Sequence, residues 1–258
     1  MGQRRRSAQP DADAASGDTD KEASRGRAGG GIWSVAKELI SVAAIALVIS
    51  FLIKTFVAQA FWIPSGSMED TLVYGDRVIV SKVQAGPLKI GRGDIVVFED
   101  PDNWLPHVTP PDRGPVLNPI VGALEFVGLA PTAEGNHLIK RVIGLGGDRV
   151  RCCDAEGRVS VNGQTLNEQT YLYPGDEPSA MSFDVTVPKG RVWVMGDHRS
   201  ISGDSRVHDD GSGATGSIPD DRIVGQAVAL VWPLSRFDWF QAPSTLTDVA
   251  GTASSPRS

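Results

Sequence analysis

The pattern of apolar and polar positions changes sharply near the N-terminus. Residues 1–31 are rich in Gly, Ala, Ser, Asp and Arg and show no apolar periodicity, so we expect a disordered tail. The next stretch, LISVAAIALVISFLI (Leu39–Ile53), carries no charge, and the apolar character continues to Ile63 with only Lys54 and Gln59 as interruptions. About 20 residues at ~1.5 Å each cross a hydrocarbon core of ~30 Å. The pattern therefore predicts a transmembrane helix.

The charges on either side of this segment predict its orientation. Four basic residues lie within the twenty residues before Leu39: Lys21, Arg25, Arg27 and Lys37. The twenty residues after Phe56 contain no Lys or Arg. The positive-inside rule then keeps the N-terminus cytoplasmic and exports the rest of the chain.

A cleavable signal peptide is the competing interpretation of the same segment. Ala58 and Ala60 form an A-x-A pattern after the apolar run, as at a signal-peptide cleavage site. However, the region before the run is long, and the run extends past this site. We therefore expect an uncleaved anchor at 35–60, and the body of the protein is extracytoplasmic on either interpretation.

After the anchor the pattern changes to short strands separated by Gly and Pro. RVSVNGQTL (Arg158–Leu166) carries Asn162-Gly163 between apolar residues, which is a strong hairpin signal. Arg222–Trp232 forms a last long strand or strand pair. Four further runs rich in Val and Ile are strand-like: Arg77–Lys82, Asp94–Phe98, Leu138–Ile143 and Arg191–Gly196. The pattern predicts a mainly β domain with a barrel-like or coiled sheet.

Two segments do not fit the strand pattern. A Pro-rich insertion occupies 99–137. Its apolar part, Ile120–Leu129, could dip into the membrane face, but we expect it to pack on the domain. The residues after Pro243 are mostly Ser, Thr and Ala, and we expect a disordered tail at 241–258.

Composition excludes several kinds of function. The chain has 25 basic and 31 acidic residues, a net charge of −6, which gives no electrostatic support for binding nucleic acid. Its two cysteines, Cys152 and Cys153, are adjacent and fit neither a zinc site nor a disulfide framework. A vicinal disulfide and a pair of small buried side chains are equally good interpretations. We expect no metal and no cofactor.

The stretch FWIPSGSMEDTL (Phe61–Leu72) suggests a nucleophile, Ser67, immediately after the apolar segment. A serine hydroxyl needs a base to remove its proton. A histidine, His198 or His208, could act with a neighbouring Asp. A buried lysine could act as well, since burial lowers the pKa of an amine, and Lys82 and Lys140 both lie in apolar strands. Periodicity does not choose between these two lysines.

The cluster GDHRSISGDSR (Gly196–Arg206) follows a strand and is dense in Asp, Arg and Ser. Such clusters usually form loops held by salt bridges, here Asp204 with Arg206. A hydroxyl such as Ser202 or Ser205 would remain to orient a neighbouring group.

Taken together, four motifs resemble those of the type I signal peptidases (leader peptidases), which are membrane-bound serine proteases with a Ser-Lys dyad. The motifs are PSGSMEDTL, YGDRVIVSK, IKRVIGLGGD and GDHRSISGDSR, and they occur in the family's order behind an N-terminal anchor. The resemblance runs from about Val35 to Trp232.

The resemblance implies a role for each matching residue. Ser67 matches the nucleophile and Lys140 the general base, which leaves Lys82 structural. The backbone N–H of Ser67 and the hydroxyl of Ser65 match the oxyanion donors. Ser202 matches the hydroxyl that orients the lysine, and Asp204 and Arg206 match the supporting ion pair.

The chain departs from the family pattern outside these positions. Asp70 and Gly146 stand where Pro is frequent, and His198, Ser200 and Ile201 replace common Asn, Asp and Asn. These departures put the loop shapes in doubt rather than the dyad. We expect His198 to be a plain surface histidine.

The resemblance also implies a domain organisation. The catalytic domain would comprise 61–147 and 191–240, interrupted by a smaller inserted β domain at 148–190. Arg222–Trp232 would return to the catalytic sheet.

The resemblance further implies the removal of signal peptides from exported preproteins, by cleavage after a small-x-small (A-x-A) pattern, at a bacterial plasma membrane. The expected partners are preproteins and membrane lipid, with no nucleic acid. Two alternatives stay open: an extracytoplasmic serine hydrolase with a histidine base, and a non-enzymatic anchored β module. Self-cleaving repressors also use a Ser-Lys pair, but they carry a DNA-binding domain where this chain has an apolar span.

Overall fold

The N-terminal apolar segment is a helix that ends earlier than the sequence pattern suggests. A computed structural model describes residues 28–83, 90–101, 104–105, 114 and 137–250. Helix α1 covers Ala28–Phe56, and Trp33–Ile53 within it is long and apolar enough to cross a membrane. The expected anchor at 35–60 is corrected at its end, because the chain forms strand β1 (Ala58–Trp62) directly after the helix. The backbone of β1 pairs with a neighbouring strand and cannot continue the helical hydrogen bonds.

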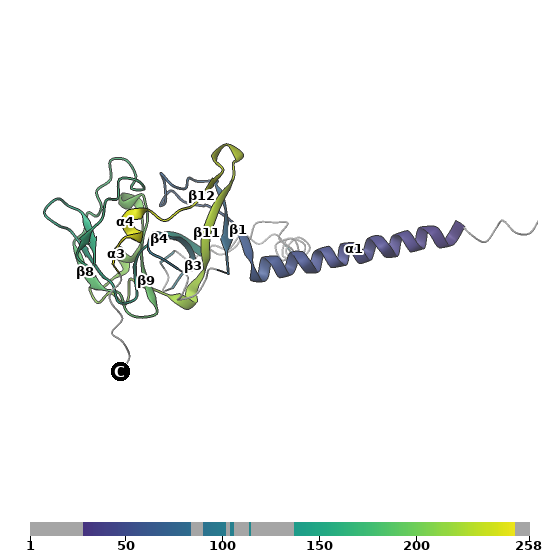
Figure 1. Cartoon of the computed structure of the whole chain (residues 1–258), viewed down its shortest axis with the longest axis horizontal. Helices are drawn as coiled ribbons and strands as arrows, with labels where there is room; N and C mark the ends of the chain where they lie inside the picture. The colour runs from purple at the N-terminus through teal and green to yellow at the C-terminus, as the bar shows by residue number, and fades with distance from the viewer. Residues whose placement is uncertain (1–27, 84–89, 102–103, 106–113, 115–136, 251–258) are drawn as a thin grey trace, which may run out of the picture. The chain divides into compact units, whose positions relative to one another are not determined.

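An eight-stranded antiparallel sheet forms the main body after the helix (Figure 1). The strand order is β1-β2-β11-β3-β4-β9-β10, and β12 pairs with β11. Besides β1, the strands are β2 (Arg77–Ser81), β3 (Ile95–Glu99), β4 (His137–Leu145), β9 (Arg191–Met195), β10 (Ile218–Pro219), β11 (Ile223–Trp232) and β12 (Asp238–Trp239). The predicted strand runs are confirmed, and β11 inserts between β2 and β3 as the last long strand.

A smaller sheet interrupts the main sheet between β4 and β9. Its order is β7-β6-β5-β8, with β5 at Arg149–Cys152, β6 at Val159–Val161, β7 at Gln164–Thr165 and β8 at Phe183–Thr186. The predicted hairpin joins β6 and β7: Asn162 and Gly163 have φ of +53° and +81°, as a tight type I′ turn requires. The fold class is therefore as expected, mainly β with a smaller inserted sheet.

The two sheets share one apolar core. Trp193 and Met195 of β9 pack with Val150 of β5 and Val161 of β6 in the same buried cluster. Cys152 is buried in this cluster and is joined to Cys153 by a disulfide.

The segment that follows β12 departs from the expected disordered tail. Helix α4 (Ser244–Thr247) forms within it (Figure 1). Leu246 and Val249 are buried in the core that the two sheets share. The Arg92 guanidinium donates to the Val249 carbonyl at 3.0 Å. Two apolar side chains three residues apart therefore hold this segment, despite its polar composition. Most of the 99–137 insertion, including Ile120–Leu129, lies outside the described residues.

Candidate active site

Ser67 lies in a tight turn between β1 and β2 that is anchored by apolar side chains on either side. Met68 and Leu72 are fully buried in a cluster with Ile63, and the Leu72 N–H donates to the Met68 carbonyl at 2.7 Å. Ser67 itself is 6% exposed. Burial of Met68 therefore fixes the turn and the direction of the neighbouring serine.

Lys140 comes from the middle of β4 and reaches this turn. Its Nζ donates to Ser67 Oγ at 2.5 Å, and the side chain is buried. Burial lowers the pKa of the Lys140 amine from 10.5 to about 8, although the carboxylates of Asp204 and Asp197 act in the opposite direction. This pKa leaves a useful fraction of neutral amine near neutral pH.

The other candidate lysine has a different position. Lys82 follows β2 and is partly exposed, and its backbone N–H donates to the Val57 carbonyl at 2.9 Å. In the sequence, Lys82 and Lys140 have similar apolar neighbours. The structure brings Lys140 to Ser67.

Ser65 lies on the same turn as the nucleophile candidate. Its hydroxyl is 3.4 Å from Ser67 Oγ. Its predicted part in binding an oxyanion stays a prediction, as does that of the Ser67 N–H.

The loop after β9 supplies the remaining predicted residues. Arg206 donates to both oxygens of Asp204 at 2.8 Å, and both residues are buried. Asp204 also accepts the Gly196 N–H at 3.0 Å. The predicted ion pair is therefore present, and it lies close enough to Lys140 to influence the pKa of the amine.

Ser202 is buried in this loop without an ordinary hydrogen bond. Within the described part of the chain, its hydroxyl has no partner of normal geometry, Lys140 included. Burial raises the pKa of the Asp204 carboxyl, but its neighbours hold this pKa below its ordinary value: Arg206 is the main one, and Ser202 lies close enough to contribute. The lysine-orienting role of Ser202 stays a prediction.

Two further buried ion pairs involve the loop after β9 and were not predicted from the sequence. Arg141, the next residue of β4, donates to both oxygens of Asp197 at 2.8 and 2.6 Å. Asp197 also accepts the Thr71 hydroxyl at 2.6 Å, which ties the turn of Ser67 to the loop after β9. Arg199 donates to Glu168 at 2.6 and 3.2 Å.

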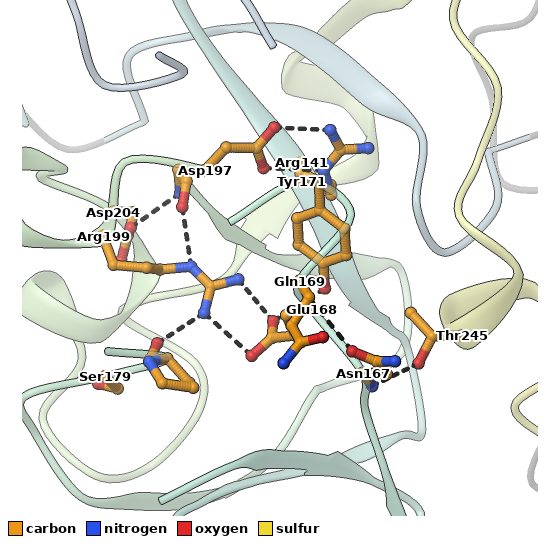
Figure 2. Close-up of polar contacts among 12 residues, drawn as sticks. Arg141, Asn167, Glu168, Gln169, Tyr171, Ser179, Asp197, Arg199, Asp204 and Thr245 are labelled. Atoms are coloured by element: carbon orange, nitrogen blue, oxygen red, sulfur yellow. Dashed lines mark hydrogen bonds and ion pairs between the residues drawn. The ribbon is translucent and has the colours of Figure 1, made fainter. Parts of the chain in front are cut away.

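Tyr171 joins these two pairs. Figure 2 shows its ring between Arg141 and the Arg199–Glu168 pair. The guanidinium carbon atoms of Arg141 and Arg199 lie 4.6 and 6.0 Å from the ring centroid, and the hydroxyl donates to Glu168 at 2.8 Å. Glu168 and Tyr171 stand in an irregular segment, so no periodicity marks them in the sequence.

The two candidate histidines, His198 and His208, contact residues other than Ser67. His198 Nδ1 is 3.1 Å from Glu69, and the ring of His208 stacks on Trp104 at 4.3 Å. Among the described residues, the hydrogen-bond partners of Ser67 Oγ are Lys140 and Ser65. His198 differs from the expected surface histidine, since its side chain is only 13% exposed.

Asp70 changes the shape of the turn. Its φ is +83°, in the left-handed region. Proline is fixed near φ −65° and cannot adopt this conformation. The turn after Ser67 therefore has a different backbone from one that carries Pro at this position.

Comparison with known proteins agrees with the four motifs. The family described as "Signal peptidase, peptidase S26" matches residues 36–232. A probable signal peptidase I of Mycobacterium leprae is 37% identical over 226 residues, which cover 78% of this chain and 77% of that protein. The signal peptidase I of Mycobacterium tuberculosis is 37% identical over 229 residues, which cover 79% and 75%.

More distant relatives carry similar names. A probable signal peptidase I-1 of Synechocystis is 36% identical over 205 residues, which cover 80% of this chain and 87% of that protein. A crystal structure of a signal peptidase I from Enterococcus faecalis aligns at a TM-score of 0.32 and 20% identity over 55% of this chain, a likeness too low to add to the argument. The family match and the long alignments confirm the resemblance seen in the sequence: this chain belongs to the signal peptidase S26 family.

Proposed function

We propose that this chain is a signal peptidase that removes signal peptides from exported preproteins, with Ser67 as nucleophile and Lys140 as general base. One observation carries the proposal: the buried amine of Lys140 lies 2.5 Å from Ser67 Oγ. Family membership supports a peptidase that acts on signal-peptide-bearing preproteins. The Ser-Lys mechanism and the cleavage specificity go beyond that support.

The proposed reaction begins with neutral Lys140. The amine accepts the Ser67 proton while Oγ attacks the scissile carbonyl carbon, forming a tetrahedral intermediate. The C–N bond then breaks, Lys140 returns the proton to the leaving amine, and an acyl-enzyme remains on Ser67. Water, deprotonated by Lys140, then attacks the ester carbonyl carbon. The bond from this carbon to Ser67 Oγ breaks, Lys140 returns the proton to Oγ, and the signal peptide leaves with a new carboxylate.

Negative charge develops on the carbonyl oxygen in both steps. The Ser67 N–H and the Ser65 hydroxyl are the proposed donors to this oxygen. Loss of one such donor costs roughly 3–4 kcal/mol of transition-state stabilisation in other proteases. The 3.4 Å distance between the Ser65 and Ser67 hydroxyls supports this assignment, because a carbonyl attacked by Ser67 Oγ would lie within reach of the Ser65 hydroxyl.

The substrate is proposed to bind as an extended strand with small side chains in two shallow pockets, so that cleavage follows an A-x-A pattern. Its own apolar segment would lie in the bilayer. An enzyme held at the same membrane meets that segment at a raised effective concentration. This accounts for a nucleophile that follows so soon after an apolar span.

Membrane attachment is proposed through α1, with the N-terminus cytoplasmic and the domain that carries Ser67 outside. Trp33–Ile53 is long enough to span. The A-x-A pattern at 58–60 lies in β1, where Ala58 and Ala60 pair with Ser81 and Ile79. A protease needs an unpaired extended substrate, so this pairing supports an anchor that stays uncleaved; a mature protein that begins at Phe61 would contradict it.

Exposed aromatic side chains at one end of the main sheet support contact with lipid. Trp62 and Trp232 both stand opposite Arg77 in the register of neighbouring strands, and Trp62 packs edge-on against Tyr74 at 5.1 Å. Trp239 on β12 is 61% exposed. Trp and Tyr are enriched at membrane interfaces, and apolar clusters exposed on a surface commonly mark binding regions.

The test is cleavage of a synthetic preprotein segment with an A-x-A site by the full chain in detergent. We expect the wild type to cut after the second Ala, and Ser67→Ala and Lys140→Ala to lose activity by about 10³-fold or more while remaining folded. Activity retained in Lys140→Ala would place the base elsewhere, and His198→Ala and His208→Ala would then test the histidine alternative. Normal function of Ser67→Ala would instead favour the non-enzymatic module.

A further inference from the structure

A second group of side chains lies beside Ser67 and takes no part in the proposed proton transfer. Glu69 belongs to the turn of Ser67, His198 to the loop after β9, and Tyr173 to the segment between β7 and β8. His198 Nδ1 lies 3.1 Å from Glu69 Oε2, and the two side chains are 13% and 33% exposed. The His198 ring stacks on Tyr173, with centroids 3.7 Å apart and planes at 11°.

His198 is fixed by its backbone as well as by its ring. Its N–H donates to the Ser67 carbonyl at 3.2 Å. The Tyr173 N–H donates to the carbonyl of Asp197, the residue before His198, at 3.0 Å. The stack and these two bonds leave the imidazole little freedom, so the ring presents Nδ1 to Glu69 in a defined direction.

Glu69 is folded back over the turn rather than extended into solvent. A Cβ added to Gly66 would come within 2.9 Å of Glu69 Oε1, which places the carboxylate against Gly66. Gly66 lies between Ser65 and Ser67, the two residues proposed to bind the oxyanion. An unpaired carboxylate here would repel the negative charge that forms in the transition state.

We propose that Glu69 and His198 are positioning residues. The His198 side chain fixes the Glu69 carboxylate and offsets its negative charge. The turn then presents Ser67 and the oxyanion donors with no unpaired negative charge beside them. The inference rests on the proposed function. Neither side chain exchanges a proton with the substrate. Tyr173 holds the imidazole in the plane that this contact requires.

A different role for the same contact gives different kinetics. If the contact between Glu69 and His198 only held the loop in place, loss of either side chain would break this contact. The double variant would then be as slow as a single variant. If His198 counteracts the charge of Glu69, removing both the charge and its partner restores the rate. The double variant therefore separates the two explanations.

The experiment uses the full chain in detergent with a synthetic A-x-A preprotein segment and compares His198→Phe, which keeps a ring to stack on Tyr173 but has no donor, with Glu69→Gln and the double variant. We expect His198→Phe to lower kcat about tenfold with KM nearly unchanged, in line with couplings measured between contacting residues. Glu69→Gln should change kcat less, because it removes the charge that His198 offsets, and the double variant should recover most of the rate. His208→Phe is the matched histidine control, because that ring stacks on Trp104 instead.

Several outcomes would overturn the inference while leaving the proposed function intact. These are an active wild type with unchanged activity in His198→Phe, a loss confined to KM, or a double variant as slow as His198→Phe. A wild type that does not cut the segment would instead contradict the proposed function. Thermal unfolding of each variant checks folding, and His198→Asn, whose side-chain amide can still donate to Glu69, provides a second variant that should retain more activity than His198→Phe.

Discussion

Gly196 lies directly against Ser67. A side-chain carbon at this position would overlap the Ser67 carbonyl oxygen and the Ser202 hydroxyl, and both atoms are buried in the contact between the turn and the loop after β9. The turn with the nucleophile candidate and the loop with the ion pairs therefore touch through a residue that has no side chain.

Gly196→Ala should separate these two segments and lower activity by about 100-fold or more, because small misplacements of catalytic groups are costly. Gly203→Ala is the matched control, since a Cβ there would meet only His208 Nε2 at 3.8 Å, an ordinary contact. Preprotein cleavage and thermal unfolding of both variants check this. Full activity in Gly196→Ala would show that the contact has no part in the reaction.

The pH dependence of cleavage should follow the Lys140 amine. Its pKa of about 8 predicts that kcat/KM rises with pH as the amine becomes neutral, with the acid limb centred near that value. Asp204 is the stronger of the two carboxylates that raise this pKa. Asp204→Asn should therefore move the acid limb to lower pH, as measured by kcat/KM across the pH range.

The matched control for this shift is Asp184→Asn, which removes a carboxylate from an exposed ion pair with Arg149. Asp204→Asn should also destabilise the fold, because it leaves Arg206 buried without its partner, typically at a cost of about 3–5 kcal/mol. An acid limb that stays in place or moves to higher pH would contradict the assignment of Lys140 as the titrating base.

Lys140 should reduce the stability of the fold. Because its pKa is lowered from 10.5 to about 8, the charged amine destabilises the folded state by about 3 kcal/mol below pH 8. This cost declines as the pH rises from about 8 towards 10.5, since the folded protein then holds fewer protons than the unfolded chain. Lys140→Met should thus be inactive yet more stable at pH 7, with a gain that shrinks at high pH in denaturant unfolding. A less stable Lys140→Met would show that the amine contributes favourable contacts that outweigh its burial.

The exposed aromatic residues should matter only at a membrane. Trp232→Ser with Trp239→Ser should lower cleavage of a preprotein held in phospholipid vesicles by about threefold or more, because apolar area would no longer be buried in the interface. Cleavage of a short soluble peptide in detergent should stay unchanged. Met181→Ser removes another exposed apolar side chain, at 42% exposure, and is the control. Equal losses in vesicles and detergent would point to a structural role.

The segment after β12 should contribute to stability. Leu246 is fully buried in the core that the two sheets share, so Leu246→Ala should cost about 2–5 kcal/mol in denaturant unfolding. Leu234→Ala is the matched control, because Leu234 is 72% exposed and should change stability by less than about 0.5 kcal/mol. Equal effects would mean that this segment does not pack as described.

The sequence alone predicted the elements that depend only on residues close together in the chain. The apolar run predicts α1 because helix length and hydrophobicity suffice for a membrane span, and Asn162-Gly163 predicts the β6–β7 turn because it needs positive φ. The strand runs were recognisable from their Val and Ile. The end of α1 could not be predicted in this way, because an apolar stretch is compatible with either helix or strand until a partner strand is available.

The positions of side chains that contact residues far away in the sequence were determined only by the tertiary structure. Lys82 and Lys140 look alike in local pattern, but pairing of β4 with β3 and β9 buries Lys140 and carries it to Ser67, 73 residues away. The same packing brings His198 to Glu69, although its position suggested a surface histidine. Burial, and with it the pKa of an amine or the pairing of a carboxylate, depends on everything that surrounds a side chain, and no window of sequence contains that information.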